Sequence, residues 1–127
     1  MAFEAVGHEV LRSVVSPQLL TAALAQANEL VKDFKAQKAP KNLLLHEERI
    51  SATGVVAPTR IERFTEFPGA LQEVCSAVTS MTEKVTERKL IILKDKLNFK
   101  YPGAGFFLPH QDTPAFQPFG SWHVSVL

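Results

Sequence analysis

The longest regular pattern of apolar positions lies near the N-terminus. Its members recur every three or four residues: Leu20, Ala23, Leu24, Ala27, Leu30, Val31 and Phe34. This spacing predicts an amphipathic helix from Ser16-Pro17 to about Lys38, because serine caps a first turn and proline fits the first helical position. Pro40 is expected to end the helix. The valine-rich residues 9–15 before it predict a short strand.

A second helix is predicted after Pro68-Gly69. Its apolar positions are Leu71, Val74, Cys75 and Val78, with a break near Ser80 and a continuation to Val85. Short strands are expected near residues 49–50, 55–56 and 61–64, and a long strand over residues 89–100. Gly103 and Gly105 predict a turn, followed by an extended segment from residue 110 and a last strand over residues 122–127.

The predicted strand over residues 89–100 has two different faces. One face carries Ile91, Leu93, Leu97 and Phe99, interrupted by Asp95, and the other carries Lys94, Lys96, Asn98 and Lys100. Two interpretations stay open. The lysines are solvated on a half-buried strand, which is the usual meaning of alternation. Alternatively, the polar face binds an anionic ligand through charge-assisted hydrogen bonds.

The triplet His110-Gln111-Asp112 carries the candidate chemistry of the chain. On extended backbone, residues two apart point to the same side, so one imidazole and one carboxylate can bind the same metal ion. Two histidines and one carboxylate are the ligand set of non-haem iron(II) oxygenases. The triplet therefore predicts His110 and Asp112 as two metal ligands. The alternative is a histidine and an aspartate that cap a loop.

Length and composition set limits on the kind of protein. The 127 residues suit one domain, 1–127, and no apolar run approaches the roughly 20 residues of a membrane span. A net charge of +1 with interspersed acids and bases indicates neither a nucleic-acid nor a membrane partner. The single Cys75 excludes an internal disulfide and is expected to be an inert, buried thiol. The N-terminus lacks a secretion signal, which predicts a cytoplasmic location.

Residues 94–116 (KDKLNFKYPGAGFFLPHQDTPAF) resemble the phytanoyl-CoA dioxygenase family of iron(II)- and 2-oxoglutarate-dependent oxygenases. Residues 7–17 and 60–67 add weaker similarity. The resemblance implies an α+β protein with a double-stranded β-helix (a jelly roll, cupin-like) and N-terminal helices packed on the sheet. It also implies hydroxylation of a small organic substrate, with Fe(II) on His110 and Asp112, 2-oxoglutarate as co-substrate and ascorbate as an optional reductant.

The resemblance also suggests which residues bind 2-oxoglutarate. It places Asn98 beside the co-substrate. The strand pattern adds one of Lys94 and Lys96, for which we take Lys96, and Ser125 on the last strand is a further candidate beside a purely structural role. The substrate stays open among acyl-CoA, small amino acid derivatives, phosphonates and alkaloid-like molecules.

The chain departs from the family after Asp112. The family has a distal histidine and then a basic residue, usually arginine, far downstream of the first two ligands. Here fifteen residues follow Asp112, His123 is the only later histidine, and no arginine follows Arg88. The chain is therefore expected to be a fragment, the N-terminal portion of an oxygenase domain, inactive alone and prone to self-association through exposed strand edges. The alternatives are a catalytically inactive short isoform and a metal-binding cupin-like interaction module.

Overall fold

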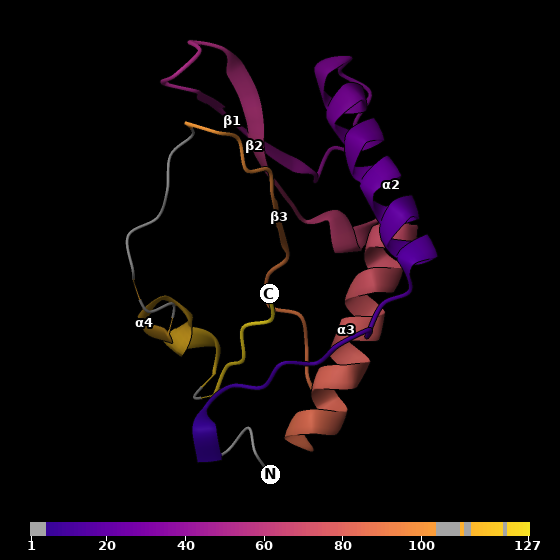
Figure 1. The fold of residues 1–127 in the computed structure, drawn as a ribbon, viewed down its shortest axis with the longest axis vertical. Helices are drawn as coiled ribbons and strands as arrows, with labels where there is room; N and C mark the ends of the chain where they lie inside the picture. Colours follow the sequence, from indigo (N-terminus) through magenta and orange to yellow (C-terminus); the bar gives the residue numbers. More distant parts are fainter. Residues whose placement is uncertain (1–4, 104–109, 111–112, 121) are drawn as a thin grey trace.

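The computed structural model of the chain describes residues 5–103, 110, 113–120 and 122–127. Two long helices and a three-stranded antiparallel sheet are its main elements, which confirms the α+β class (Figure 1). The elements are α2 (Pro17–Lys35), β1 (Leu44–Arg49), β2 (Val56–Glu62), η1 (Phe64–Glu66), α3 (Ala70–Thr86), β3 (Lys96–Asn98), α4 (Thr113–Phe116) and η2 (Gln117–Phe119).

Helix α2 begins where the sequence predicts and ends three residues early. The Ser16 hydroxyl accepts a hydrogen bond from the backbone N–H of Leu19 at 3.2 Å, as expected of a capping serine. The helix stops at Lys35 because Gln37 adopts a left-handed conformation (φ 59°), and the next two backbone N–H groups both donate to the Asp33 carbonyl. The buried stripe is narrower than predicted, since Leu20 and Leu24 are exposed.

Helix α3 runs unbroken, so the predicted break near Ser80 is wrong. The hydroxyls of Ser76, Thr82 and Thr86 each donate to the backbone carbonyl four residues earlier. These bonds satisfy the polar side chains inside the helix and remove the reason for a break. The start of α3 is held by α2: Gln26 accepts from the Leu71 N–H at 2.8 Å and donates to the Pro68 carbonyl.

The strands are arranged in the order β1-β2-β3. Both pairs are antiparallel, and the β1–β2 register shifts between His46 and Glu47, where β2 has one extra residue. Strand β3 spans only Lys96–Asn98 and pairs with residues 60–62 of β2, so the predicted strand over residues 89–100 is too long. The Phe99 N–H adds one further bond, to the Thr59 carbonyl.

Other predicted strands are absent from the described part of the chain. Residues 9–15 and 122–127 have no regular structure, and the chain after Asp112 forms the short helix α4. Proline suits the first turn of a helix, and Pro114 occupies that place in α4. The turn at Gly103 is confirmed by its φ of 75°, and a Cβ there would lie 2.6 Å from the Ala52 Cβ. Gly105 lies outside the described residues.

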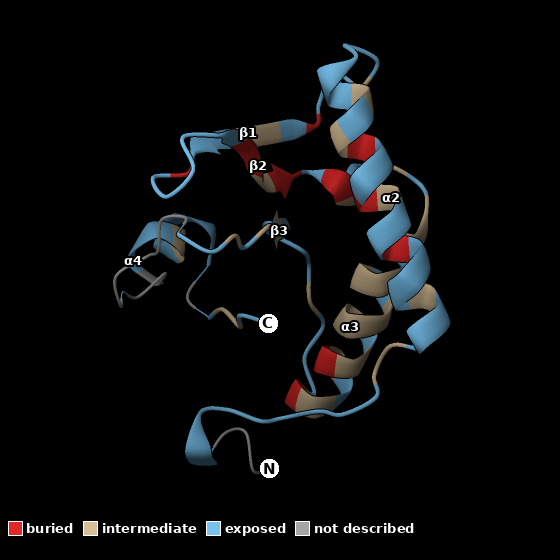
Figure 2. Cartoon of the chain, turned by 45° about the horizontal axis from the view of Figure 1, so that its top comes forward, coloured by how far each residue is buried: buried red, intermediate tan, exposed pale blue. Residues whose placement is uncertain are grey.

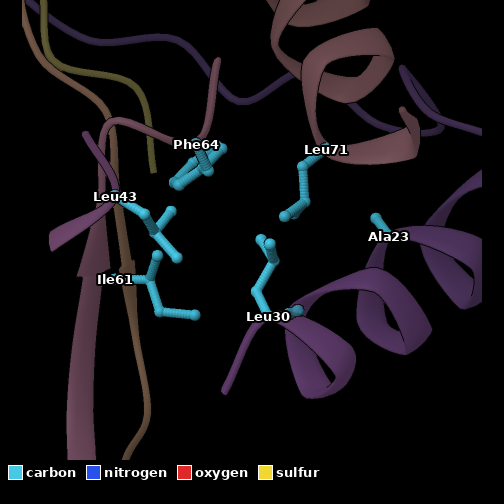
Figure 3. Close-up of a cluster of buried hydrophobic side chains, with 7 residues drawn as sticks. Ala23, Leu30, Leu43, Ile61, Phe64 and Leu71 are labelled. Atoms are coloured by element: carbon cyan, nitrogen blue, oxygen red, sulfur yellow. The ribbon is translucent and has the colours of Figure 1, made fainter. Parts of the chain in front are cut away.

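The core lies between the two long helices and one face of the sheet. Figure 3 shows Leu43, Ile61 and Phe64 pointing toward the side chains of Leu30 and Leu71. Ile61 is the largest fully buried side chain among the described residues. In Figure 2, buried positions gather on α2, α3 and the sheet, whereas α4 carries none among its described side chains. Burial of this apolar cluster is what joins the helices to the sheet.

The described residues contain one small sheet and do not by themselves make up a double-stranded β-helix. That finer prediction of the fold therefore stays a prediction. In the described parts of the chain, every helix is too short or too polar to cross a membrane.

Candidate functional site

The two faces of the sheet carry different chemistry. Directly opposed residues of antiparallel strands share a face, so Leu45, Ile61 and Leu97 form one row across the sheet, on the side of the core. The next residues along each strand face the other way. They form two rows on the outer face: His46, Arg60 and Asn98, and then Leu44, Glu62 and Lys96.

This outer face, which we call the polar face, presents the two predicted co-substrate residues of β3. Asn98 stands opposite Arg60, and Lys96 stands opposite Glu62. Both residues are exposed, as the alternation predicts. Leu97 and Phe99 point the other way and pack against the core cluster. Helices α2 and α3 lie to one side of the sheet and α4 to the other (Figure 1).

Glu62 is the centre of an ion-pair cluster on the polar face. Its side chain is 9% exposed, and its carboxylate lies 2.8 Å from Arg60 Nε and 3.2 Å from Lys94 Nζ. His46 Nε2 lies 3.7 Å from the same carboxylate. The cluster therefore brings together β1, β2 and the segment that leads into β3. A carboxylate that is taken out of water needs such partners, because burial of an unpaired charge is costly.

Three atoms in this cluster are sheltered from solvent without a hydrogen bond of good geometry. They are His46 Nε2, Arg60 Nε and Glu62 Oε1. Arg60 and Glu62 are close enough to attract each other, but their relative orientation does not direct an N–H at the oxygen. Since buried polar atoms are nearly always paired in folded proteins, this cluster is incompletely satisfied.

The interruption of the strand pattern at Asp95 has a structural cause. Asp95 is 8% exposed, and its carboxylate accepts hydrogen bonds from the backbone N–H groups of Arg63 and Thr65 and from the Thr65 hydroxyl. It thereby caps η1 from a distant part of the sequence. This contact turns the chain inward just before β3, which explains the late start of the strand. Lys94 and Lys96 lie directly before and after this anchored aspartate in the sequence.

The predicted metal ligands are only partly within the described chain. His110 is exposed, and Asp112 lies outside the described residues. Ser125 is exposed in the segment over residues 122–127, and its proposed role stays a prediction. Within the described ranges, no three His, Cys, Asp or Glu side chains gather as a metal site. The described residues alone therefore do not assemble a three-ligand iron centre.

His123 packs in the same part of the chain as α4. Its ring centroid lies 5.8 Å from that of Phe116, and both of its ring nitrogens are sheltered without a hydrogen-bond partner among the described residues. Next to it, Trp122 lies under the guanidinium of Arg88, whose Cζ is 4.9 Å from the ring centroid. This cation–π contact ties the segment over residues 122–127 to the chain just after α3.

Cys75 is less buried than the sequence predicts. It is half-buried on α3 and forms no disulfide. Burial raises the pKa of its thiol, and the nearby negative charge of Asp95 raises it further. A raised pKa keeps the thiol protonated at neutral pH, which is the opposite of what a nucleophilic cysteine needs.

Two curated enzymes are similar to this chain. One is 2-aminoethylphosphonate dioxygenase from the uncultured bacterium HF130_AEPn_1, which is 31% identical over 116 residues, covering 85% of this chain and 43% of the enzyme. The other is methylphosphonate hydroxylase from Gimesia maris, 28% identical over 104 residues, covering 80% of this chain and 40% of the enzyme. Both of these similar enzymes are named for a phosphonate. The chain spans about two fifths of the length of these relatives.

No family model and no solved structure matches the chain. The relationship to oxygenases agrees with the broad part of the resemblance found in the sequence, while the narrower assignment to the phytanoyl-CoA dioxygenase family stays a prediction. Both relatives carry a phosphonate in their names, and phosphonates are among the substrate classes that the sequence leaves open.

Sequence reasoning missed the part played by Arg60 and Glu62. Both lie in the segment over residues 60–67 that carries part of the resemblance, but neither was predicted to have a role. The available signal was the pattern Arg-Ile-Glu, in which two opposite charges flank a buried isoleucine on one strand. Lys94, which the sequence left as an alternative to Lys96, is the lysine that contacts Glu62.

Proposed function

We propose that this chain is part of an iron(II)- and 2-oxoglutarate-dependent oxygenase that hydroxylates an organophosphonate. The observation that carries the proposal is similarity to a dioxygenase and a hydroxylase of phosphonates over 85% and 80% of the chain. The triplet His110-Gln111-Asp112 adds independent support, since it offers an imidazole and a carboxylate at the spacing that such enzymes use.

In this proposal, His110 and Asp112 are two of the iron ligands. Iron(II) with 2-oxoglutarate and oxygen would supply the oxidising chemistry, and the protein would supply binding and orientation. Asn98 and Lys96 would hold 2-oxoglutarate through an amide and an ammonium group, with Ser125 as a further contact. Their exposed positions on the polar face, beside Arg60, support this role.

The test uses the protein encoded by the complete reading frame that contains this sequence. It is incubated with iron(II), 2-oxoglutarate, ascorbate and oxygen, together with methylphosphonate or 2-aminoethylphosphonate. Succinate formation and the ³¹P NMR signal of the phosphonate are followed together. We expect succinate to form in step with phosphonate consumption.

Variants connect that activity to the proposed ligands. His110→Ala and Asp112→Ala should each abolish turnover, because a facial site that loses one of three protein ligands holds iron poorly. Gln111→Ala is the matched control, since the residue between the two ligands points away from them. Near-normal turnover by His110→Ala would refute the assignment. Loss of turnover in His123→Ala would add His123 to the ligand set.

A further inference from the structure

The ion-pair cluster on the polar face has more positive than negative charge. Arg60 and Lys94 both contact one carboxylate, that of Glu62, and Lys96 stands opposite Glu62 on β3. One positive charge is therefore in excess among the contacting groups, even with His46 neutral. Like charges brought together in this way repel one another, so the cluster is electrostatically incomplete without a further anion.

The hydrogen bonding of the cluster points the same way. Arg60 Nε and His46 Nε2 are sheltered from solvent and lack a well-directed acceptor, although Glu62 lies beside both. An unsatisfied buried group in a folded protein calls for an explanation, and a bound ligand or ion is one of the few available. An anion that enters between these side chains would supply acceptors as well as charge.

The geometry of the sheet suits a tetrahedral anion with three oxygens. The donors come from three places: Arg60 from β2, His46 from β1 and Lys94 from the segment before β3. A register shift directly beside His46 alters the aim of the side chains at this row, as bulges commonly do next to binding sites. A guanidinium binds such an anion through two parallel N–H groups, which the ammonium of a lysine does not reproduce.

We propose that Arg60 and Lys94, with His46, bind the phosphonate group of the substrate, and that Glu62 is a positioning residue that holds these cations in place. The choice of a phosphonate rests on the proposed function. The site is distinct from the residues assigned to 2-oxoglutarate, Asn98 and Lys96, but it adjoins them because Asn98 stands opposite Arg60. Substrate and co-substrate would then lie side by side on one face of the sheet.

Binding without turnover tests this site. Methylphosphonate is titrated into the protein in the absence of iron and 2-oxoglutarate, and binding is followed by ³¹P NMR and by calorimetry. We expect saturable binding that weakens at least tenfold in Arg60→Gln and in Lys94→Gln. Arg60→Lys, which keeps the charge but loses the fork, should fall between the wild type and Arg60→Gln. Circular dichroism melting confirms that each variant is folded.

Arg49→Gln is the matched control, because Arg49 lies on the same sheet and its side chain donates to the Gly54 carbonyl rather than to the Glu62 cluster. It should bind methylphosphonate like the wild type. Lys94 is 41% exposed, so Lys94→Gln tests the proposal even where Arg60→Gln fails to fold. Absence of saturable binding in the wild type, or unchanged binding in folded Arg60→Lys and Lys94→Gln, would overturn the site.

A competition arm identifies which anion the site takes. Addition of 2-oxoglutarate should leave methylphosphonate binding in place, whereas competitive displacement would assign the cluster to the co-substrate and overturn the proposal. Failure of the proposed function has a different result: methylphosphonate then binds with the expected dependence on Arg60, but no succinate forms when iron and 2-oxoglutarate are added.

Discussion

The two faces of the small sheet bury neighbouring residues of β2 by opposite means. On the core face, Ile61 is fully buried by the side chains of α2, η1 and α3. On the polar face, its neighbour Glu62 is almost as well buried, but by the charged side chains of Arg60, Lys94 and His46. Hydrophobic burial is non-directional and insensitive to moderate salt, whereas ion pairs depend on geometry, partner charge and ionic strength.

The two faces of the sheet differ in what they can contribute to stability and to binding. The core face holds the helices on the sheet, and its apolar residues offer no charge to a ligand. The polar face holds a carboxylate that is surrounded by more cations than it needs. Substitutions on the first face should therefore change stability alone, and substitutions on the second should change both stability and the response to anions.

The largest effect is expected on the core face. Ile61→Ala removes a fully buried side chain and leaves a cavity between the sheet and the helices, which should lower the free energy of unfolding by about 3 kcal/mol. Urea unfolding followed by circular dichroism measures it. Ile91→Ala is the control, because Ile91 is 88% exposed and should cost almost nothing. Equal effects of the two substitutions would show that the core is misplaced.

The next effect concerns the residue that joins β3 to η1. Asp95→Ala leaves the N–H groups of Arg63 and Thr65 without their acceptor and should cost about 2 kcal/mol, measured by the same unfolding experiment. Asp95→Asn keeps the shape of the side chain but replaces one carboxylate oxygen with an NH2 group, which cannot accept a hydrogen bond from a backbone N–H. It should therefore recover little of the lost stability. Full stability of Asp95→Asn would show that the capping contact does not depend on the carboxylate.

The sequence predicts local contacts of this fold better than remote ones. Ser16 marks the start of α2 because its cap is local, and the alternation around Leu97 and Phe99 places the correct residues on the core. The sequence fails where the partner is remote. The late start of β3 depends on Asp95 bonding to residues about thirty positions earlier, and the start of α3 depends on Gln26 of another helix.

The same difference between local and remote contacts applies to the candidate site. The sequence pattern places Asn98 and Lys96 on the polar face, since alternation is a local property. It does not show that Arg60, Lys94 and His46 converge on Glu62, because that convergence requires the register of three strands and the shift beside His46. The position of a third iron ligand relative to His110 and Asp112 is a further property of the fold that no local pattern contains.

A smaller effect is expected from Glu62 itself. Glu62→Gln removes the single negative charge of the cluster and leaves Arg60 and Lys94 facing each other, which should cost about 1 kcal/mol because both cations keep partial access to water. The loss should shrink when 0.5 M salt screens the repulsion, or when an anion such as methylphosphonate is added. Ile61→Ala provides the contrast, since its cost should be independent of salt. A salt-independent cost for Glu62→Gln would show that the two faces do not differ in how they depend on charge.

The smallest effect lies away from both faces, at the end of α3. The Glu83 carboxylate accepts a hydrogen bond from the Leu90 N–H at 2.9 Å and pairs with Lys89 at 3.2 Å, and these contacts hold its pKa below the ordinary value of 4.5. A carboxyl group whose pKa is lower in the folded state stabilises the fold above its unfolded pKa. That contribution disappears as the pH falls through the folded value.

Glu83→Gln should therefore lower the melting temperature slightly at pH 7, and the difference from the wild type should vanish well below pH 4.5. Glu48→Gln, which replaces an exposed carboxylate on β1, is the control and should leave the melting temperature at pH 7 unchanged. A constant difference between wild type and Glu83→Gln from pH 7 down to pH 3 would mean that the carboxylate charge has no part in holding the loop after α3.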